Sequence, residues 1–274
     1  MEDYQLTKVT IEGLARPYIL EADSIDKLLI NPGRKLLGYK RQKAAFAATV
    51  SWLSAMKAEG YFPHSATDLC TVTVMAEAAG HNLSGALSTV LNDDIYRGDN
   101  FMGVSRFALA EKAPEGYTNY DARVTYMRLH SVAPVWCLLD TVATGATLVR
   151  GLEAAFQNAQ KPRRILMGTP AGAVVGMRKL EDLCRKEGID FIPTFFGAAF
   201  GLFEDGSGLP WCHPDTILAG TERSRVNLEN ARKIFNNNQA FCAVGDCSAN
   251  FFDVQVAMEH LKDEEERLCW KLPI

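Results

Sequence analysis

Residues 135–148 read VWCLLDTVATGATL and decide the fold of this chain. The first five of these residues are all apolar, which predicts a strand buried on both faces, as in a parallel sheet. A turn containing Thr144 and Gly145 follows, and apolar residues then recur at helical spacing from Leu148 to Phe156. The stretch therefore predicts a strand, a tight turn and a helix in succession.

The start of this helix is a candidate site for an anion. The first N–H groups of a helix lack partners within it and lie at the positive end of its dipole. Gly145 allows the backbone to approach a ligand closely. Asp140, just before the turn, is able to accept hydrogen bonds from sugar hydroxyls or to help hold a hydrated magnesium ion. An ordinary strand–turn–helix unit with a threonine N-cap is the alternative interpretation.

Further strands and helices alternate along the chain. Hydrophobic patterns predict strands at 69–75, 123–129, 164–168 and 190–194, and helices at 40–58, 83–91, 174–186 and 252–268. This alternation predicts right-handed βαβ units and therefore an α/β fold with a parallel, twisted sheet flanked by helices. Ligands of such sheets bind at the carboxyl ends of the strands. Because Glu77, Asp140 and Thr169 follow three such strands, we expect them to share one cleft.

Composition restricts the class of protein. The chain has 274 residues, a net charge of -4, 47% hydrophobic and 23% charged residues, which is typical of a globular domain without a nucleic-acid surface. The polar start at Met1 is unlike a secretory signal, and no apolar run is long enough to span a membrane. The seven cysteines contain no CxxC pair, so we expect reduced thiols in a cytoplasmic protein.

The stretch LLDTVATGATL at 138–148 resembles the phosphoribosyl-pyrophosphate (PRPP) motif of type I phosphoribosyltransferases, in the variants of the adenine and uracil enzymes. The resemblance implies the fold of that family. It implies that Asp140 is a catalytic residue that binds the ribose hydroxyls and is a ligand of Mg²⁺. It also implies that five residues hold the 5′-phosphate, namely Ala143, Thr144, Gly145, Ala146 and Thr147. The family often has two adjacent acids, and Leu139 stands at the first position here.

Two more segments are similar to that family. The loop at 75–81 corresponds to its pyrophosphate loop, which implies substrate contacts from Gly80 and His81, although Glu77 stands near the place of the usual arginine. Residues 92–122 correspond to a mobile loop that closes over the substrate, which implies a contact from Arg106; a surface loop without function is the alternative. The segment around Gly245 and Asp246 resembles the base-recognition segment of uracil phosphoribosyltransferases.

These features lead to three hypotheses of function. The first is a magnesium-dependent transfer of ribose 5-phosphate from PRPP to a nitrogenous base, with a pyrimidine-like base preferred. The second is a non-catalytic PRPP- or nucleotide-binding regulator, which Glu77 and Leu139 favour because each weakens a substrate contact. The third is a phosphotransfer or hydrolytic enzyme on the same scaffold. We expect neither nucleic acid nor membrane as a partner, and we expect a homodimer.

The predicted organisation is a single domain over 1–274, with a core at about 60–200, an N-terminal helical extension at 1–59 and an irregular C-terminal hood at 201–274. Two smaller features have plain alternatives. Basic residues cluster at the start of the helix predicted at 40–58, and a solvated helix face is favoured over phosphate contacts for them: Lys35, Lys40, Arg41 and Lys43. For His213 and Asp215, a turn flanked by prolines is favoured over a catalytic pair.

Overall fold

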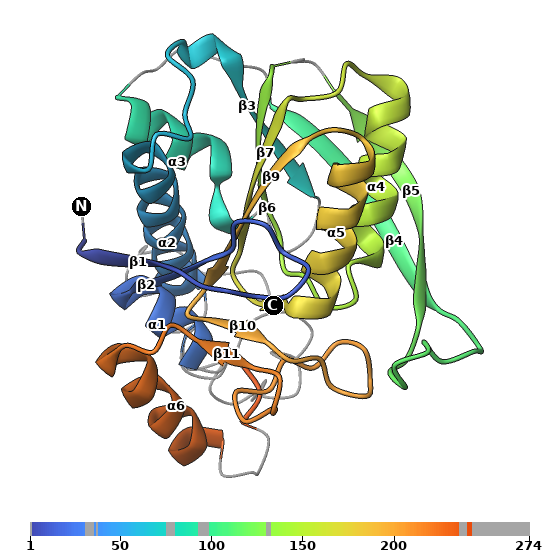
Figure 1. Ribbon diagram of the computed structural model, residues 1–274. Coiled ribbons are helices and arrows are strands. Elements are labelled where there is room, and N and C mark those ends of the chain that lie inside the picture. The colour runs from blue at the N-terminus through green and yellow to red at the C-terminus, as the bar shows by residue number, and fades with distance from the viewer. Residues whose placement is uncertain are drawn as a thin grey trace, which may run out of the picture.

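A computed structural model describes residues 2–30, 36, 38–74, 80–92, 99–129, 133–235 and 240–242. Its main sheet has eight strands in the order β1-β2-β9-β7-β6-β3-β4-β5 (Figure 1). The six inner strands are parallel, and the two edge strands, β1 and β5, are antiparallel to their neighbours. The predicted α/β fold with a parallel sheet is therefore confirmed. The bounds are β1 (Tyr4–Lys8), β2 (Tyr18–Ala22), β3 (Leu69–Val74), β4 (Asn100–Ala108), β5 (Tyr120–Arg128), β6 (Val135–Leu139), β7 (Arg164–Thr169) and β9 (Asp190–Phe196).

Helices cover both faces of this sheet. On one face lie α1 (Asp23–Ile30), α2 (Gly38–Ala58) and α3 (Leu83–Leu91), and on the other lie α4 (Ala146–Asn158) and α5 (Val174–Lys186) (Figure 1). Strand side chains alternate between the faces. Cys137 packs in the cluster that contains Trp52 of α2, whereas Trp136 packs in the cluster that contains Leu152 of α4. Every residue of β6 is buried, as its apolar sequence predicts.

A smaller sheet and one helix lie at the carboxyl edge of the main sheet (Figure 1). The strands β8 (Gly172–Ala173), β10 (Ala198–Phe200) and β11 (Ile217–Leu218) pair in the order β11-β10-β8, and α6 (Glu222–Phe235) follows. Of the hood predicted at 201–274, the described part contains β11 and α6 among irregular segments. A short 3₁₀ helix, η1 (Ala66–Asp68), precedes β3. The helix predicted at 252–268 lies outside the described residues.

Two expectations need correction. The segment 1–59 is not only helical, because it contributes β1 and β2 to the main sheet. The run 92–122 is not a structureless loop, because 100–108 and 120–128 form the hairpin of β4 and β5. Gly103 and a register shift interrupt the pattern of β4, and β2 pairs with a strand far away in the sequence, so neither strand gives a strong local signal.

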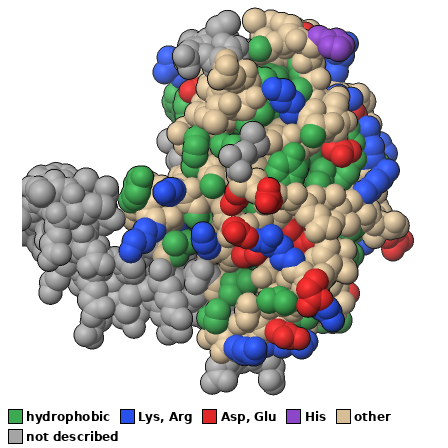
Figure 2. Space-filling view, turned by 90° about the vertical axis from the view of Figure 1, so that its left-hand side faces the viewer, with side chains coloured by type: hydrophobic (Ala, Val, Ile, Leu, Met, Phe, Trp, Pro, Cys, Tyr) green, Lys and Arg blue, Asp and Glu red, His purple; other side chains and the backbone are tan. Residues whose placement is uncertain are grey.

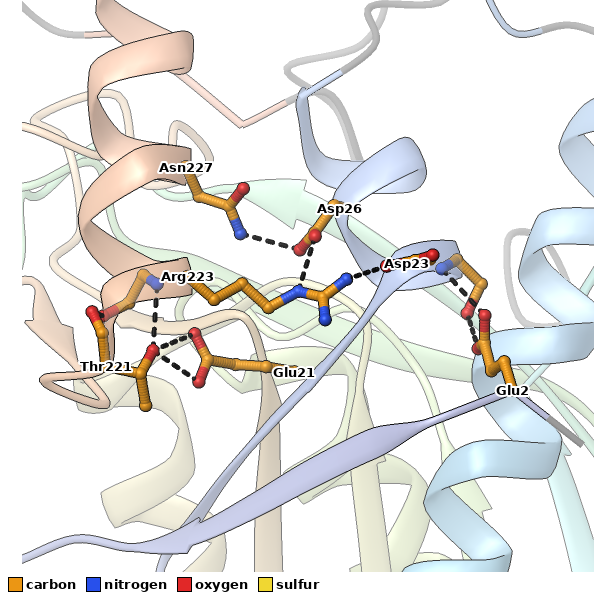
Figure 3. Close-up of polar contacts among 9 residues, drawn as sticks. Glu2, Glu21, Asp23, Asp26, Thr221, Arg223 and Asn227 are labelled. Atoms are coloured by element: carbon orange, nitrogen blue, oxygen red, sulfur yellow. Dashed lines mark hydrogen bonds and ion pairs between the residues drawn. The ribbon is translucent and has the colours of Figure 1, made fainter.

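A partly buried polar cluster fixes α6 to α1 and β2 (Figure 3). Glu21 has no exposed surface, and both of its carboxylate oxygens accept from Thr221 Oγ1, at 2.9 and 2.8 Å. Arg223 Nε and Asn227 Nδ2 donate to the two oxygens of Asp26, each at 2.7 Å. Burial raises the pKa values of both Glu21 and Asp26. The cluster therefore joins residues 21–26 to residues 221–227.

The side of the molecule seen in Figure 2 gives little sign of a polyanion-binding face. This side carries acidic and basic side chains next to one another rather than a basic patch. In the part of the chain that the structure describes, no helix has the length and apolar character needed to cross a bilayer.

Candidate functional site

The loop after β6 is fixed to the turn after β7 by backbone hydrogen bonds. The N–H of Asp140 donates to the carbonyl of Gly168 at 3.3 Å, and the N–H of Val142 donates to that of Ala171 at 2.9 Å. In return, the N–H of Ala173 donates to the carbonyl of Val142 at 2.6 Å. The structure therefore brings Asp140 and the segment at Thr169 to one edge of the sheet, as the sequence predicts.

Two glycines let the first turns of α4 and α5 touch. Gly145 has φ +81°, in the left-handed region that favours glycine, and its carbonyl accepts from Val149 N at 2.9 Å. A Cβ atom on Gly145 would lie 2.8 Å from the carbonyl oxygen of Gly176 in α5. A Cβ atom on Gly176 would overlap the carbonyl oxygen of Ala143. Any larger residue at either position therefore forces the two backbones apart.

The start of α4 has the properties of an anion site. Three residues of the turn and first helical positions are partly exposed, namely Ala143, Ala146 and Thr147. Thr144 and Gly145 are buried. No side chain caps this helix, as judged from its N-cap residue Gly145. Because a helix start leaves its first N–H groups without carbonyl partners, those groups are available to a ligand beyond the helix.

Asp140 lies at the foot of this loop, where its side chain is 8% exposed. Among the described residues, no group of three or more His, Cys, Asp or Glu side chains is arranged to hold a metal ion. Magnesium often keeps several waters and binds one or two carboxylates together with substrate phosphates. The single carboxylate of Asp140 fits that mode of binding, and it does not fit a cage built from protein ligands alone.

The other predicted site residues that the structure describes come from other elements of the fold. His81 is 4% exposed and packs on α2, with Nδ1 3.3 Å from Thr49 Oγ1. Burial lowers its pKa to about 4, so the ring is neutral. The substrate contact of His81 stays a prediction, and the ring packs in the interior, whereas Gly80 before it is exposed. Arg106 stays within the hairpin, with its guanidinium 4.6 Å from the ring centre of Tyr120. Glu77, Gly245 and Asp246 lie outside the described residues.

A cleft of about 820 Å³ opens beside the start of α5. Its walls come from the hairpin tip near Tyr117, the first turn of α5 and the small sheet, and its apolar lining includes Val175, Leu202 and Ile217. This volume is within the range of ligand pockets, about 300–1,000 Å³. Sequence reasoning missed the cleft because its three walls are far apart in the chain.

His213 lies in the wall of this cleft. Its Nδ1 accepts from the backbone N–H of Asp215 at 3.2 Å, so the proton of the neutral ring is on Nε2. The Asp215 carboxylate is 3.8 Å from the same nitrogen, and Thr216 N donates to the carbonyl of His213 at 3.0 Å. These contacts describe a turn rather than a catalytic pair.

The hairpin tip is attached to both neighbouring walls. Thr118 N donates to the carbonyl of Glu204 at 2.8 Å, and the Tyr120 hydroxyl donates to that of Asp205 at 3.2 Å. Lys179 Nζ of α5 donates to the Tyr117 hydroxyl at 3.2 Å. The β4–β5 hairpin therefore forms one side of the cleft.

Comparison with known proteins gives a consistent but distant picture. No protein-family model and no curated protein matches this chain. The solved structures that resemble it include hypoxanthine-guanine phosphoribosyl transferase of L. donovani (19% identity, TM-score 0.33), with 55% of this chain and 77% of that one covered. Another is adenine phosphoribosyl transferase of Trypanosoma brucei, in complex with AMP, pyrophosphate and ribose-5-phosphate (11% identity, TM-score 0.41), with 68% of this chain and 86% of that one covered. A third is hypoxanthine phosphoribosyltransferase of Staphylococcus aureus (14% identity, TM-score 0.32), with 56% of this chain and 73% of that one covered. The fold assignment therefore rests on the strand order of the chain itself.

Proposed function

We propose that this chain is a phosphoribosyltransferase that binds PRPP at the loop after β6 and transfers its ribose 5-phosphate to a nitrogenous base. The observation that carries the proposal is the start of α4. An uncapped helix end, opened by a left-handed glycine, lies directly after the acid at a strand end. This combination of N–H donors and a carboxylate matches a sugar phosphate, in which a dianion and two hydroxyls lie a few bonds apart.

Each part of the loop has its own role in this proposal. The N–H groups from Thr144 to Thr147 and the backbone at Ala143 hold the 5′-phosphate. The Asp140 carboxylate accepts from the ribose hydroxyls and contributes one ligand to Mg²⁺, which supplies charge neutralisation for the departing pyrophosphate. Holding the sugar in one orientation contributes further to the rate.

The cleft beside α5 is the proposed acceptor site. Val175 lines the cleft, and the next residue, Gly176, contacts the phosphate loop, so the two sites share the first turn of α5. The apolar side chains of Val175, Leu202 and Ile217 suit the faces of a planar base, and charged residues of the lining, with the Nε2–H of His213, offer polar partners for its edge. The bond from the sugar to pyrophosphate breaks while a bond to a ring nitrogen forms, and the proton of that nitrogen leaves to solvent.

The preference for a pyrimidine-like base stays a prediction, because Gly245 and Asp246, on which it rests, lie outside the described residues. The homodimer and the cytoplasmic location also stay predictions. The three solved structures named above are purine enzymes by name, so they lend no support to a pyrimidine preference.

One experiment separates the three hypotheses of function. Calorimetric titration with PRPP and Mg²⁺ measures binding, and release of pyrophosphate is followed with and without a panel of bases. A transferase binds PRPP and releases pyrophosphate only when an accepted base is present. Binding without release for every base supports the non-catalytic regulator, and release without base supports the hydrolytic alternative.

A second experiment tests the acceptor site. Leu202→Trp fills the cleft from its apolar side, and it should raise the KM for the base while leaving the affinity for PRPP within about twofold, since the cleft and the phosphate loop are separate contacts. A KM for the base that Leu202→Trp leaves unchanged contradicts the assignment of the cleft. Thermal unfolding of the variant shows whether the small sheet is intact.

A further inference from the structure

A second, smaller pocket of about 240 Å³ lies between the first turns of α2 and the turn that precedes α3. Its lining consists of Gly38, Arg41, Gln42, Ala45, Gly80 and His81. The volume is below the range of pockets for drug-sized ligands, about 300–1,000 Å³. It therefore suits a small inorganic group.

The topology places this pocket at the edge of the sheet where Asp140 lies. The helix α2 ends at Ala58 and connects through η1 to the first residue of β3, so its own start is at the opposite, carboxyl edge. The strands β3 and β6 are parallel neighbours in which Thr73 pairs with Leu139. The end of β3 therefore lies beside the end of β6, one strand spacing of about 4.8 Å away, and Asp140 follows β6 directly.

The lining of the pocket offers donors and positive charge. Arg41 supplies a guanidinium and Gln42 a side-chain amide, and none of the six lining residues is an acid. The His81 ring is neutral, because burial and the nearby charge of Arg41 lower its pKa. The charge of the pocket therefore comes from Arg41, and guanidinium groups bind phosphate oxygens through two parallel hydrogen bonds.

We propose that Arg41 binds the pyrophosphate group of PRPP from α2. This inference rests on the proposed function. It assigns to Arg41 the positive charge that the loop between β3 and α3 does not supply. The loop between β3 and α3 contains Glu77 and no arginine or lysine from Met75 to Asn82, so a cation for a pyrophosphate at this edge has to come from another element. Within the lining that the structure describes, Arg41 is the cation beside Gly80 and His81.

The test compares two ligands that differ only in the pyrophosphate. Ribose 5-phosphate and PRPP, each with Mg²⁺, are titrated calorimetrically into the full chain, its Arg41→Gln and Arg41→Lys variants, and Lys43→Gln. The last is a matched control, because Lys43 is exposed on the same helix and its loss changes the net charge equally. We expect Arg41→Gln to weaken PRPP binding about 10- to 100-fold and ribose 5-phosphate binding less than twofold. Arg41→Lys should lose less of the PRPP affinity than Arg41→Gln, and Lys43→Gln should bind PRPP as tightly as the wild type.

Several outcomes overturn the inference. An unchanged PRPP affinity in Arg41→Gln does so, and so does an equal loss for both ligands, which indicates a structural role for Arg41. A wild-type chain that binds neither sugar phosphate overturns the proposed function instead. Inorganic pyrophosphate then tests Arg41 directly, and an affinity that Arg41→Gln leaves unchanged removes the site. Urea unfolding of each variant identifies a loss of binding that is caused by a loss of structure.

Discussion

Replacing Gly145 by alanine tests the contact on which the phosphate site depends. The residue has φ +81°, where an L-amino acid with a Cβ atom is strained by about 1–2 kcal/mol. Its Cβ would also lie 2.8 Å from a backbone oxygen of Gly176, which cannot rotate away as a side chain can. Overpacking of this kind costs about 1–3 kcal/mol. We therefore expect Gly145→Ala to lower the free energy of unfolding by about 2–5 kcal/mol.

Gly188→Ala is the matched control for this substitution. Gly188 has φ +69°, and a Cβ atom there would meet nothing within 4 Å, so only the backbone strain applies. We expect it to cost about 1–2 kcal/mol and to leave ligand binding unchanged, since it lies at the far end of α5. Urea unfolding gives the free energies, and calorimetry with ribose 5-phosphate gives the affinities. Equal destabilisation of the two variants, together with an unchanged affinity in Gly145→Ala, would refute both the close contact and the phosphate site.

Three further predictions concern the role of Asp140, the pH dependence of stability and the contacts of α6. Asp140→Asn should weaken Mg²⁺-dependent PRPP binding at least tenfold in calorimetry, and an unchanged affinity contradicts its role. Because the folded pKa of His81, about 4, is below the ordinary 6.5, its contribution to stability is complete above pH 6.5 and is lost as the pH falls through 4. Urea unfolding of His81→Gln should accordingly show a weaker loss of stability over that range than the wild type. Arg223→Gln leaves the partly buried Asp26 without its cation and should cost about 1–3 kcal/mol, whereas Arg225→Gln removes only an exposed pair with Glu222 and should cost less than about 1 kcal/mol in the same assay.

Local patterns predict the central units of this fold well. The strand at 135–139 and the helices at 83–91 and 174–186 have the predicted bounds, because each carries a complete apolar pattern of its own. The strands β1 and β2 are missed, since β2 is specified by pairing with β9 and by burial under residues far along the chain. The apolar pattern of α6 is equally weak, because polar contacts of the cluster around Arg223 help to fix that helix.

The candidate site shows the same division. The loop from Asp140 to Thr147 follows from its own residues, which place an acid, a turn and a helix start in order. The contact between Gly145 and Gly176 cannot be predicted from local sequence, because it joins two helices through tertiary packing. Gly176 is nevertheless a signal of this contact in the sequence. A glycine within the first turn of a helix costs about 1 kcal/mol relative to alanine, which indicates that close packing requires it.

The pairing of β2 with β9 has a consequence for synthesis. Tyr18 pairs with Thr194, so the first strands leave the ribosome about 175 residues ahead of the strand that completes them. At about 5–20 residues per second, this delay is roughly 9–35 s. During that interval Ile19 and Leu20, which are fully buried in the finished molecule, stay without their neighbour. The nascent N-terminus is therefore a natural client for a chaperone, and translation speed should influence the yield of native protein.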